Sequence, residues 1–145
     1  MTDSNFPEEP CGMHEDTFGE VLARKTITDE MIDNALLVDE KQLSELIKLI
    51  GLDTFNAIMD DFKIEITQRF EAMSSLQDNP HDLAKELHII TSCGGNLGMS
   101  KFSLLARQTM NKIDRSQPVD IPLALRRIQE MYEDSLKLFM LRSRT

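Results

Sequence analysis

The chain has 145 residues, with 25 acidic and 16 basic side chains, and its net charge of −9 limits what it can bind. No basic stripe is present to neutralise phosphates, which argues against nucleic acids and anionic membrane surfaces as partners. Solubility accounts for most of this acidic surface. A chain of this length can bury the core of one domain without disulfides or metals. Leu, Ile, Met and Phe dominate the apolar residues, which predicts an all-α protein.

No signal peptide, transit peptide or long apolar run is visible in the sequence. This predicts a cytoplasmic protein that does not enter a membrane. The two cysteines, Cys11 and Cys93, are then expected to be reduced thiols. Cys93 is most simply a small residue packed near the interior of the fold.

Residues 1–37 form an N-terminal extension that precedes the periodic part of the chain. The extension is polar and irregular, and we expect it to be partly disordered. Thr28 can open a short capped helix over 28–36. This segment is expected either to pack on the rest as an extra helix or to serve as a docking arm. Residues 38–145 are predicted to form the helical domain.

Five amphipathic helices are predicted in this domain. Asp39 caps the first, Gln42 is placed to return the bond as in a capping box, and Gly51 ends it. Ser100 is expected to cap the fourth. Short connections make neighbours antiparallel, which predicts an up-and-down antiparallel four-helix bundle with an additional N-terminal helical segment. The four long helices are expected over 53–77, 80–97, 100–115 and 120–142.

The segment His88–Gly98 stands out within the helix that Asn79 and Pro80 open. His88 lies one residue off the apolar stripe of this helix, so we expect it at the edge of the buried face. Gly94 and Gly95 each cost about 1 kcal/mol in a helix relative to Ala. We expect Gly94 to permit close packing of another helix and Gly95 to permit approach of an outside partner. The stripe consists of Leu83, Leu87, Ile90, Gly94 and Leu97.

This segment resembles the phosphorylated stretch of histidine phosphotransfer (HPt) domains in multistep phosphorelays. The usual run of that family is His-x-Leu-Lys-Gly-Ser-Ala/Ser-Gly/Ala-Asn-Leu/Ile-Gly. His88, the apolar Ile90 and the closing run 95–98 (Gly-Asn-Leu-Gly) match it. Thr91 stands where the family has lysine, and Ser92 stands where it has glycine. The order of the surrounding helices extends the resemblance over residues 38–142.

The resemblance implies that His88 carries a phosphoryl group between receiver-domain aspartates, or from a hybrid sensor kinase to a response regulator. Neutral imidazole is a nucleophile near pH 7, and phosphoryl transfer needs mainly positioning and charge neutralisation. The sequence has no nucleotide-binding signature, so the protein is not expected to be an enzyme or an autokinase. No cofactor is expected on this chain, because the receiver domain would supply Mg²⁺. The protein is expected to be a monomer.

The partner-docking surface implied around His88 consists of residues one helical turn away. Lys85 is one candidate to replace the missing lysine, and Arg107 or Gln108 on the following helix are others. His81 lies about 10 Å from His88 by helical rise, too far for both to hold one ion, so no metal site is predicted. The surface is predicted to contain Ala84, Lys85, Thr91, Ser92 and Gly95.

Two alternatives remain open from the sequence. Because Thr91 and Ser92 depart from the family run, the protein could be a degenerate bundle without efficient transfer. Such a module would bind a receiver or kinase as an inhibitor or scaffold. The other alternative is a helical structural protein unrelated to signalling, in which His88 is an ordinary, partly exposed helix residue.

Overall fold

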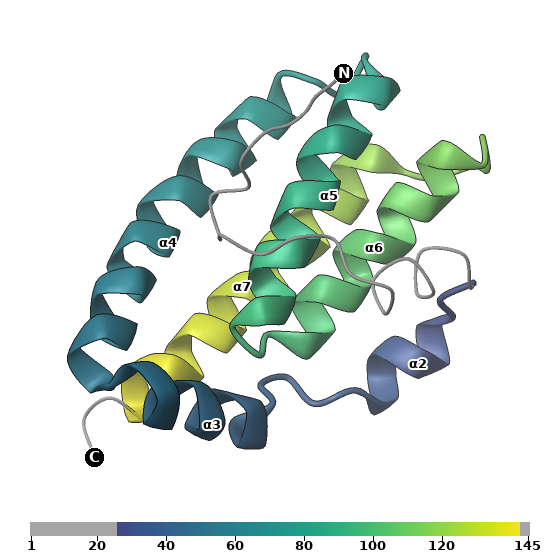
Figure 1. The fold of residues 1–145 in the computed structure, drawn as a ribbon. Helices are drawn as coiled ribbons and strands as arrows, with labels where there is room; N and C mark the ends of the chain where they lie inside the picture. The colour runs from purple at the N-terminus through teal and green to yellow at the C-terminus, as the bar shows by residue number, and fades with distance from the viewer. Residues whose placement is uncertain (1–25, 143–145) are drawn as a thin grey trace, which may run out of the picture.

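The computed structural model describes residues 26–142, and the regular structure in this range is entirely helical (Figure 1). This confirms the prediction of an all-α protein. The disorder predicted before Thr26 concerns residues outside the described range. None of the helices in 26–142 combines the length and apolar character needed to span a bilayer. The helices are α2 (Asp29–Asn34), α3 (Glu40–Ile50), α4 (Leu52–Ser74), α5 (Pro80–Asn96), α6 (Ser100–Asp114) and α7 (Ile121–Arg142).

Polar side chains open most of these helices where the sequence predicted. Thr28 and Asp39 each accept a hydrogen bond, at 3.1 Å, from the backbone N–H three residues later, and they open α2 and α3. Asn79 does the same for α5 at 3.3 Å, and Asp120 for α7 at 3.1 Å. Each bond satisfies one of the N–H groups that lack a partner within the helix.

The turn from α5 into α6 is set by Gly98, whose φ of 82° is the left-handed conformation predicted for it. The Met99 N–H donates to the Gly94 carbonyl at 2.9 Å, and the Gly98 N–H donates to the Gly95 carbonyl at 3.2 Å. This pair of bonds is a Schellman motif. The predicted cap at Ser100 is wrong: Ser100 is the first residue of α6, and Met99 holds the cap position without a side-chain bond. The cap position thus falls one residue before Ser100, on an apolar side chain that makes no capping hydrogen bond.

The start of α3 is tied to the end of α5. The Gln42 side-chain amide donates to the carbonyls of Gly95 at 2.8 Å and Asn96 at 3.3 Å. The Asp39 N–H donates to the Gly98 carbonyl at 2.7 Å. The predicted return bond from Gln42 to its cap is therefore wrong, because the Gln42 amide donates to carbonyls in the last turn of α5 instead. These three bonds join the start of α3 to the end of α5, although the two helices are distant in sequence.

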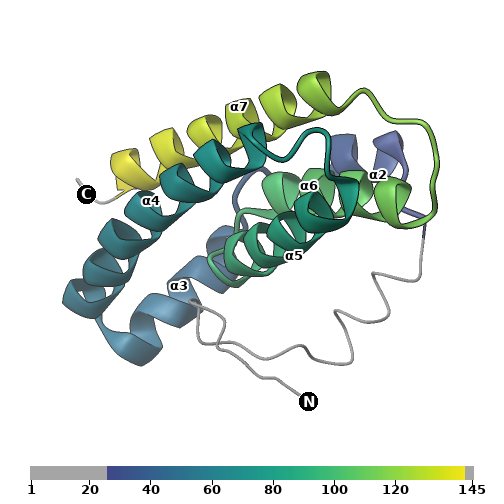
Figure 2. The ribbon, with the colours of Figure 1, turned by 90° about the horizontal axis from the view of Figure 1, so that it is seen from above.

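The four long helices contact one another in a closed series. α4 contacts α5, α5 contacts α6, α6 contacts α7, and α7 returns to α4. Figures 1 and 2 show α5 and α6 lying side by side along most of their lengths. They form the closest pair and run in opposite directions, joined by the short turn at Gly98.

The short helix α2 packs against α6. The Lys101 ammonium donates to the carbonyls of Ile32 at 2.9 Å and Asp33 at 2.8 Å, at the end of α2. The Gln108 amide donates to the Ile27 carbonyl at 2.8 Å. Of the two roles expected for this segment, the structure shows the extra packed helix.

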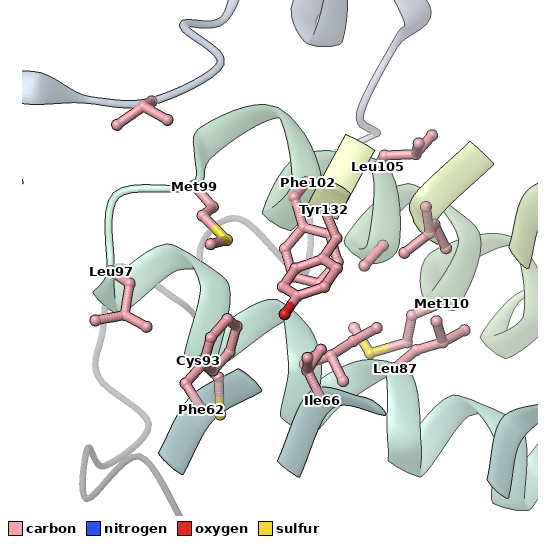
Figure 3. Close-up of a cluster of buried hydrophobic side chains, with 14 of the residues drawn as sticks. Phe62, Ile66, Leu87, Cys93, Leu97, Met99, Phe102, Leu105, Met110 and Tyr132 are labelled. Carbon is pink, nitrogen blue, oxygen red and sulfur yellow. The ribbon is translucent and has the colours of Figure 1, made fainter. Parts of the chain in front are cut away.

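Phe102 is fully buried at the centre of the core (Figure 3). Its ring centroid lies 6.5 Å from that of Phe70 on α4 and 5.9 Å from that of Tyr132 on α7. A Cβ added at Gly94 would overlap the Phe102 ring. The expectation that Gly94 permits close helix packing is confirmed, and the neighbour is α6.

Gly94→Ala should destabilise the protein by about 1–3 kcal/mol, because the Phe102 ring is held by other rings and cannot move aside freely. Helix propensity alone predicts the opposite sign, a gain of about 1 kcal/mol. Urea unfolding followed by circular dichroism measures the difference. A more stable Gly94→Ala variant would contradict the described packing.

Tyr132 is the only tyrosine of the chain and is buried between Phe62 and Phe70. Burial, with a smaller contribution from the Glu133 carboxylate, raises the pKa of Tyr132 to about 12. The folded protein therefore holds the phenol proton more tightly than the unfolded chain, whose tyrosine pKa is about 10.

We expect the ultraviolet absorbance of phenolate to appear near pH 12 in the folded protein, and near pH 10 after unfolding in urea. The stability that this phenol contributes should be complete below pH 10 and be lost as the pH rises toward 12. A spectrophotometric titration of native and urea-unfolded protein checks this. Titration of native Tyr132 near pH 10 would contradict its burial.

Candidate functional site

His88 lies on α5 immediately after Leu87, which is fully buried. Its own side chain is half-buried, as expected for a residue at the edge of the apolar stripe. The predicted stripe itself is confirmed: each of its members, Leu83, Leu87, Ile90, Gly94 and Leu97, is buried.

The side of α5 next to His88 is joined to α6 by a reciprocal pair of hydrogen bonds. Thr91 Oγ1 donates to the Ser103 carbonyl at 2.5 Å and lies 3.1 Å from Ser103 Oγ. Ser103 Oγ donates to the Thr91 carbonyl at 2.7 Å. Each hydroxyl thus donates to the backbone carbonyl of the residue on the other helix. These two bonds fix the register of α5 against α6.

The five residues predicted as a docking surface are divided by this arrangement. Lys85 is exposed, and Ser92 and Gly95 are partly exposed on the outer face with His88. Thr91 is only 1% exposed and Ala84 only 7%, so neither lies on the surface. Residues three and four positions away flank His88 on both sides, and α6 covers one of those sides.

Gly95 also serves the packing role that was expected only of Gly94. A Cβ at Gly95 would lie 3.2 Å from Ser103 Oγ, a tight contact. The Ser103 hydroxyl is held by its bonds to Thr91, so it has little freedom to move away. The two adjacent glycines therefore both let α6 approach α5 closely, and Gly95 is in addition partly open to the outside.

On its other side, α5 is joined to α4 by an ion pair. Arg69 Nη1 lies 2.9 Å from Glu86 Oε1, and Arg69 Nη2 lies 3.0 Å from Glu65 Oε2. The spacing of Glu65 and Arg69 (i, i+4) could have indicated their pairing in the sequence, whereas the bond to Glu86 depends on the packing of two helices. The Arg69 guanidinium is thus engaged away from the α6 side of His88.

The structure separates the two residues of α6 that the sequence offered as neighbours of His88. The Gln108 amide donates to the Ile27 carbonyl at 2.8 Å and to Asp29 Oδ1 at 3.0 Å, so it belongs to the contact with α2. Arg107 is only 6% exposed and lies four residues after Ser103, on the same side of α6.

Cys93 is buried as expected, at 3% exposed, but it is disulfide-bonded and not a free thiol. The expectation of a reduced thiol at this position is therefore wrong. The expectation came from the predicted cytoplasmic location and not from any feature of Cys93 itself. In the part of the chain that the structure describes, no three His, Cys, Asp or Glu side chains gather as metal ligands.

Comparisons of the chain with protein-family profiles, with curated proteins and with solved structures find no match. The function is therefore argued from the residues and geometry of this chain.

Thr91→Val should cost about 1 kcal/mol of stability, because it keeps the shape of the side chain and removes its bond to Ser103. Thr91→Lys should cost more, because it forces an ammonium group into a buried position. Ser92→Ala, one residue along on the outer face, should change stability by less than about 0.5 kcal/mol. Chemical denaturation of the three variants tests this order, and a stable Thr91→Lys protein would contradict the burial of Thr91.

Proposed function

We propose that this protein is a histidine phosphotransfer protein. It receives a phosphoryl group on His88 from one receiver-domain aspartate, or from a hybrid sensor kinase, and passes it to a response regulator. Its fold is then the up-and-down four-helix bundle of α4 to α7, with α3 and α2 added at the N-terminal side. The closed series of contacts among the four long helices supports this architecture.

The observation that carries the proposal is a histidine presented beside small residues on a firmly held helix. Ser92 and Gly95 flank the outer side of His88, so another protein can come close to its imidazole. Ties to three neighbouring elements fix α5: Thr91 with α6, the Gln42 amide from α3, and the ion pair of Glu86 with α4. Phosphoryl transfer depends mainly on such positioning.

The proposed reaction conserves atoms and charge within the two proteins. The lone pair of a neutral imidazole nitrogen of His88 forms a bond to the phosphorus of an aspartyl phosphate. The bond between that phosphorus and the aspartate oxygen breaks, and its electron pair leaves with the regenerated carboxylate. Transfer onward reverses these steps on a second receiver aspartate. Mg²⁺ would be held by the receiver, where it neutralises charge on the moving group.

A second function is favoured by Thr91, which stands where the resembled family has lysine. The Thr91 side chain is uncharged, and it is buried and hydrogen-bonded within the α5–α6 seam, so this turn of α5 offers no cation to a phosphoryl group. A bundle that binds a receiver or a kinase as an inhibitor or scaffold, without efficient transfer, would tolerate that loss.

His88→Gln should abolish phosphorylation by phosphorylated receiver domains while leaving the helical content unchanged, because the side chain is only half-buried. His81→Gln is the matched control, since His81 is an exposed histidine on the same helix. We expect label on the wild type and on the control that is acid-labile and alkali-stable. Label that persists in His88→Gln would contradict the site, and receiver binding without label in the wild type would favour the inhibitor or scaffold.

A further inference from the structure

The disulfide bond of Cys93 gives the N-terminal extension a second point of attachment to the fold. The sequence contains one further cysteine, Cys11, which lies outside the described residues. Within a single chain, Cys11 is therefore the only partner available to Cys93. The extension would then be held at Cys93 as well as on α6, where the described chain begins.

The attachment on α6 is a stripe of three polar residues. Lys101, Gln108 and Arg115 all donate hydrogen bonds to the segment 26–33. Because they are spaced by seven residues, nearly two helical turns, they share one side of α6. That side is turned by about 120–160° from Ser103, which faces α5. The described chain thus begins on the side of α6 that lies away from α5.

Cys93 lies at the opposite edge of this helix pair. It follows Glu86 by seven residues, so the two share one side of α5. Glu86 is paired there with Arg69 of α4, at 2.9 Å. Thr91, which bonds to α6, is turned by about 160° from Cys93 around α5. Between these two edges, the outer face of α5 carries the half-buried His88.

The length of the connecting chain favours a route across this outer face. The sequence places Thr26 15 residues after Cys11, and such a segment spans at most about 50 Å. The direct route passes over α6 and α5, about 20 Å across. The route around α7 and α4 adds at least two more helix diameters of about 10 Å, which would require an almost fully extended segment. The direct route leaves ample slack.

His88 lies at the level where the direct route crosses α5. Thr91 and Ser103 face each other, and the two helices are antiparallel. Cys93 is about 3 Å to one side of this level, and the residues of α6 that hold the start of the described chain are about 8–18 Å to the other. His88 is three residues before Thr91, about 4.5 Å toward that second side. It therefore lies between the two points of attachment.

We propose that a disulfide bond between Cys11 and Cys93 holds residues 12–25 across the outer face of α5, where they shield His88, and that reduction of this bond opens the site. This inference rests on the proposed phosphotransfer function and adds a redox control to it. For the cytoplasmic location that the sequence predicts, disulfides are mostly transient, catalytic or redox-sensing. The occupant of the face is thus a segment of the same chain.

The reductant is a dithiol. One of its thiolates attacks a sulfur atom of the disulfide, which forms a mixed disulfide and displaces one cysteine as a thiolate. The second thiolate of the reductant then attacks the mixed disulfide and releases the other cysteine. Two electrons pass to the two cysteines, which take up protons as thiols, and the reductant leaves as a disulfide. Exchange with an oxidised dithiol closes the bond again.

Peptide mapping of the full chain by mass spectrometry, without reductant, tests the pairing. We expect the oxidised monomer to yield one linked pair of peptides that contains Cys11 and Cys93. A covalent dimer joined through Cys93, or two free thiols after incubation with oxidised glutathione, would overturn the proposal.

Diethyl pyrocarbonate, which acylates neutral imidazole, measures access to His88 and needs no phosphotransfer activity. Reduction with dithiothreitol should speed the acylation of His88 about tenfold, because the reactive population is then no longer limited by the shielding segment. Cys11→Ser is the matched control. It should react as fast as the reduced wild type, and dithiothreitol should leave its rate unchanged. A phosphorylated receiver domain as donor should show the same dependence on reduction.

The outcomes distinguish this inference from the function on which it rests. Equal acylation of His88 in oxidised and reduced protein would overturn the redox control, and so would a response of Cys11→Ser to dithiothreitol. A loss of helical content on reduction, measured by circular dichroism, would assign the bond a structural role instead. Acylation that depends on reduction, in a protein that takes no label from phosphorylated receivers in either state, would support the shielded face and contradict the phosphotransfer function.

Discussion

The close approach of α5 and α6 is the constraint on which the rest of the structure depends. Two adjacent glycines on α5 remove the side chains that would separate the helices, and Phe102 fills the space over Gly94. That ring then contacts rings from α4 and α7, so one helix pair organises the aromatic core of the described residues. The same approach brings Thr91 against Ser103, which fixes the register of the seam and the position of His88 along it.

The candidate site is thus a consequence of packing as much as of its own residues. His88 needs no unusual backbone of its own. Its orientation follows from a helix that is held at its end by Gln42, on one side by Ser103 and on the other by Arg69. Each tie satisfies a polar group that would otherwise be costly to bury, so holding the helix and stabilising the fold are one effect.

Local chemistry made much of this fold predictable from the sequence. The caps at Thr28, Asp39 and Asn79 and the left-handed Gly98 depend on a few neighbouring residues, and the apolar stripe of α5 follows from helical spacing alone. The side of α5 that α6 covers could not be predicted, because rotation between packed helices depends on both surfaces at once. The burial of Thr91, which was expected on a docking surface, follows from that rotation.

The bonds from α3 to the end of α5 have a consequence for how the chain folds. Thr91 and Ser103 are 12 residues apart, whereas Gln42 and Gly95 are 53 residues apart. Closing the longer loop costs more chain entropy, and the carbonyls that Gln42 reaches are held in position only once the end of α5 and its turn have formed. We therefore expect the α5–α6 hairpin to form early as a local nucleus, with α3 docking afterwards. The N-terminal helices would then be the last part of the described chain to gain protection from hydrogen exchange during refolding.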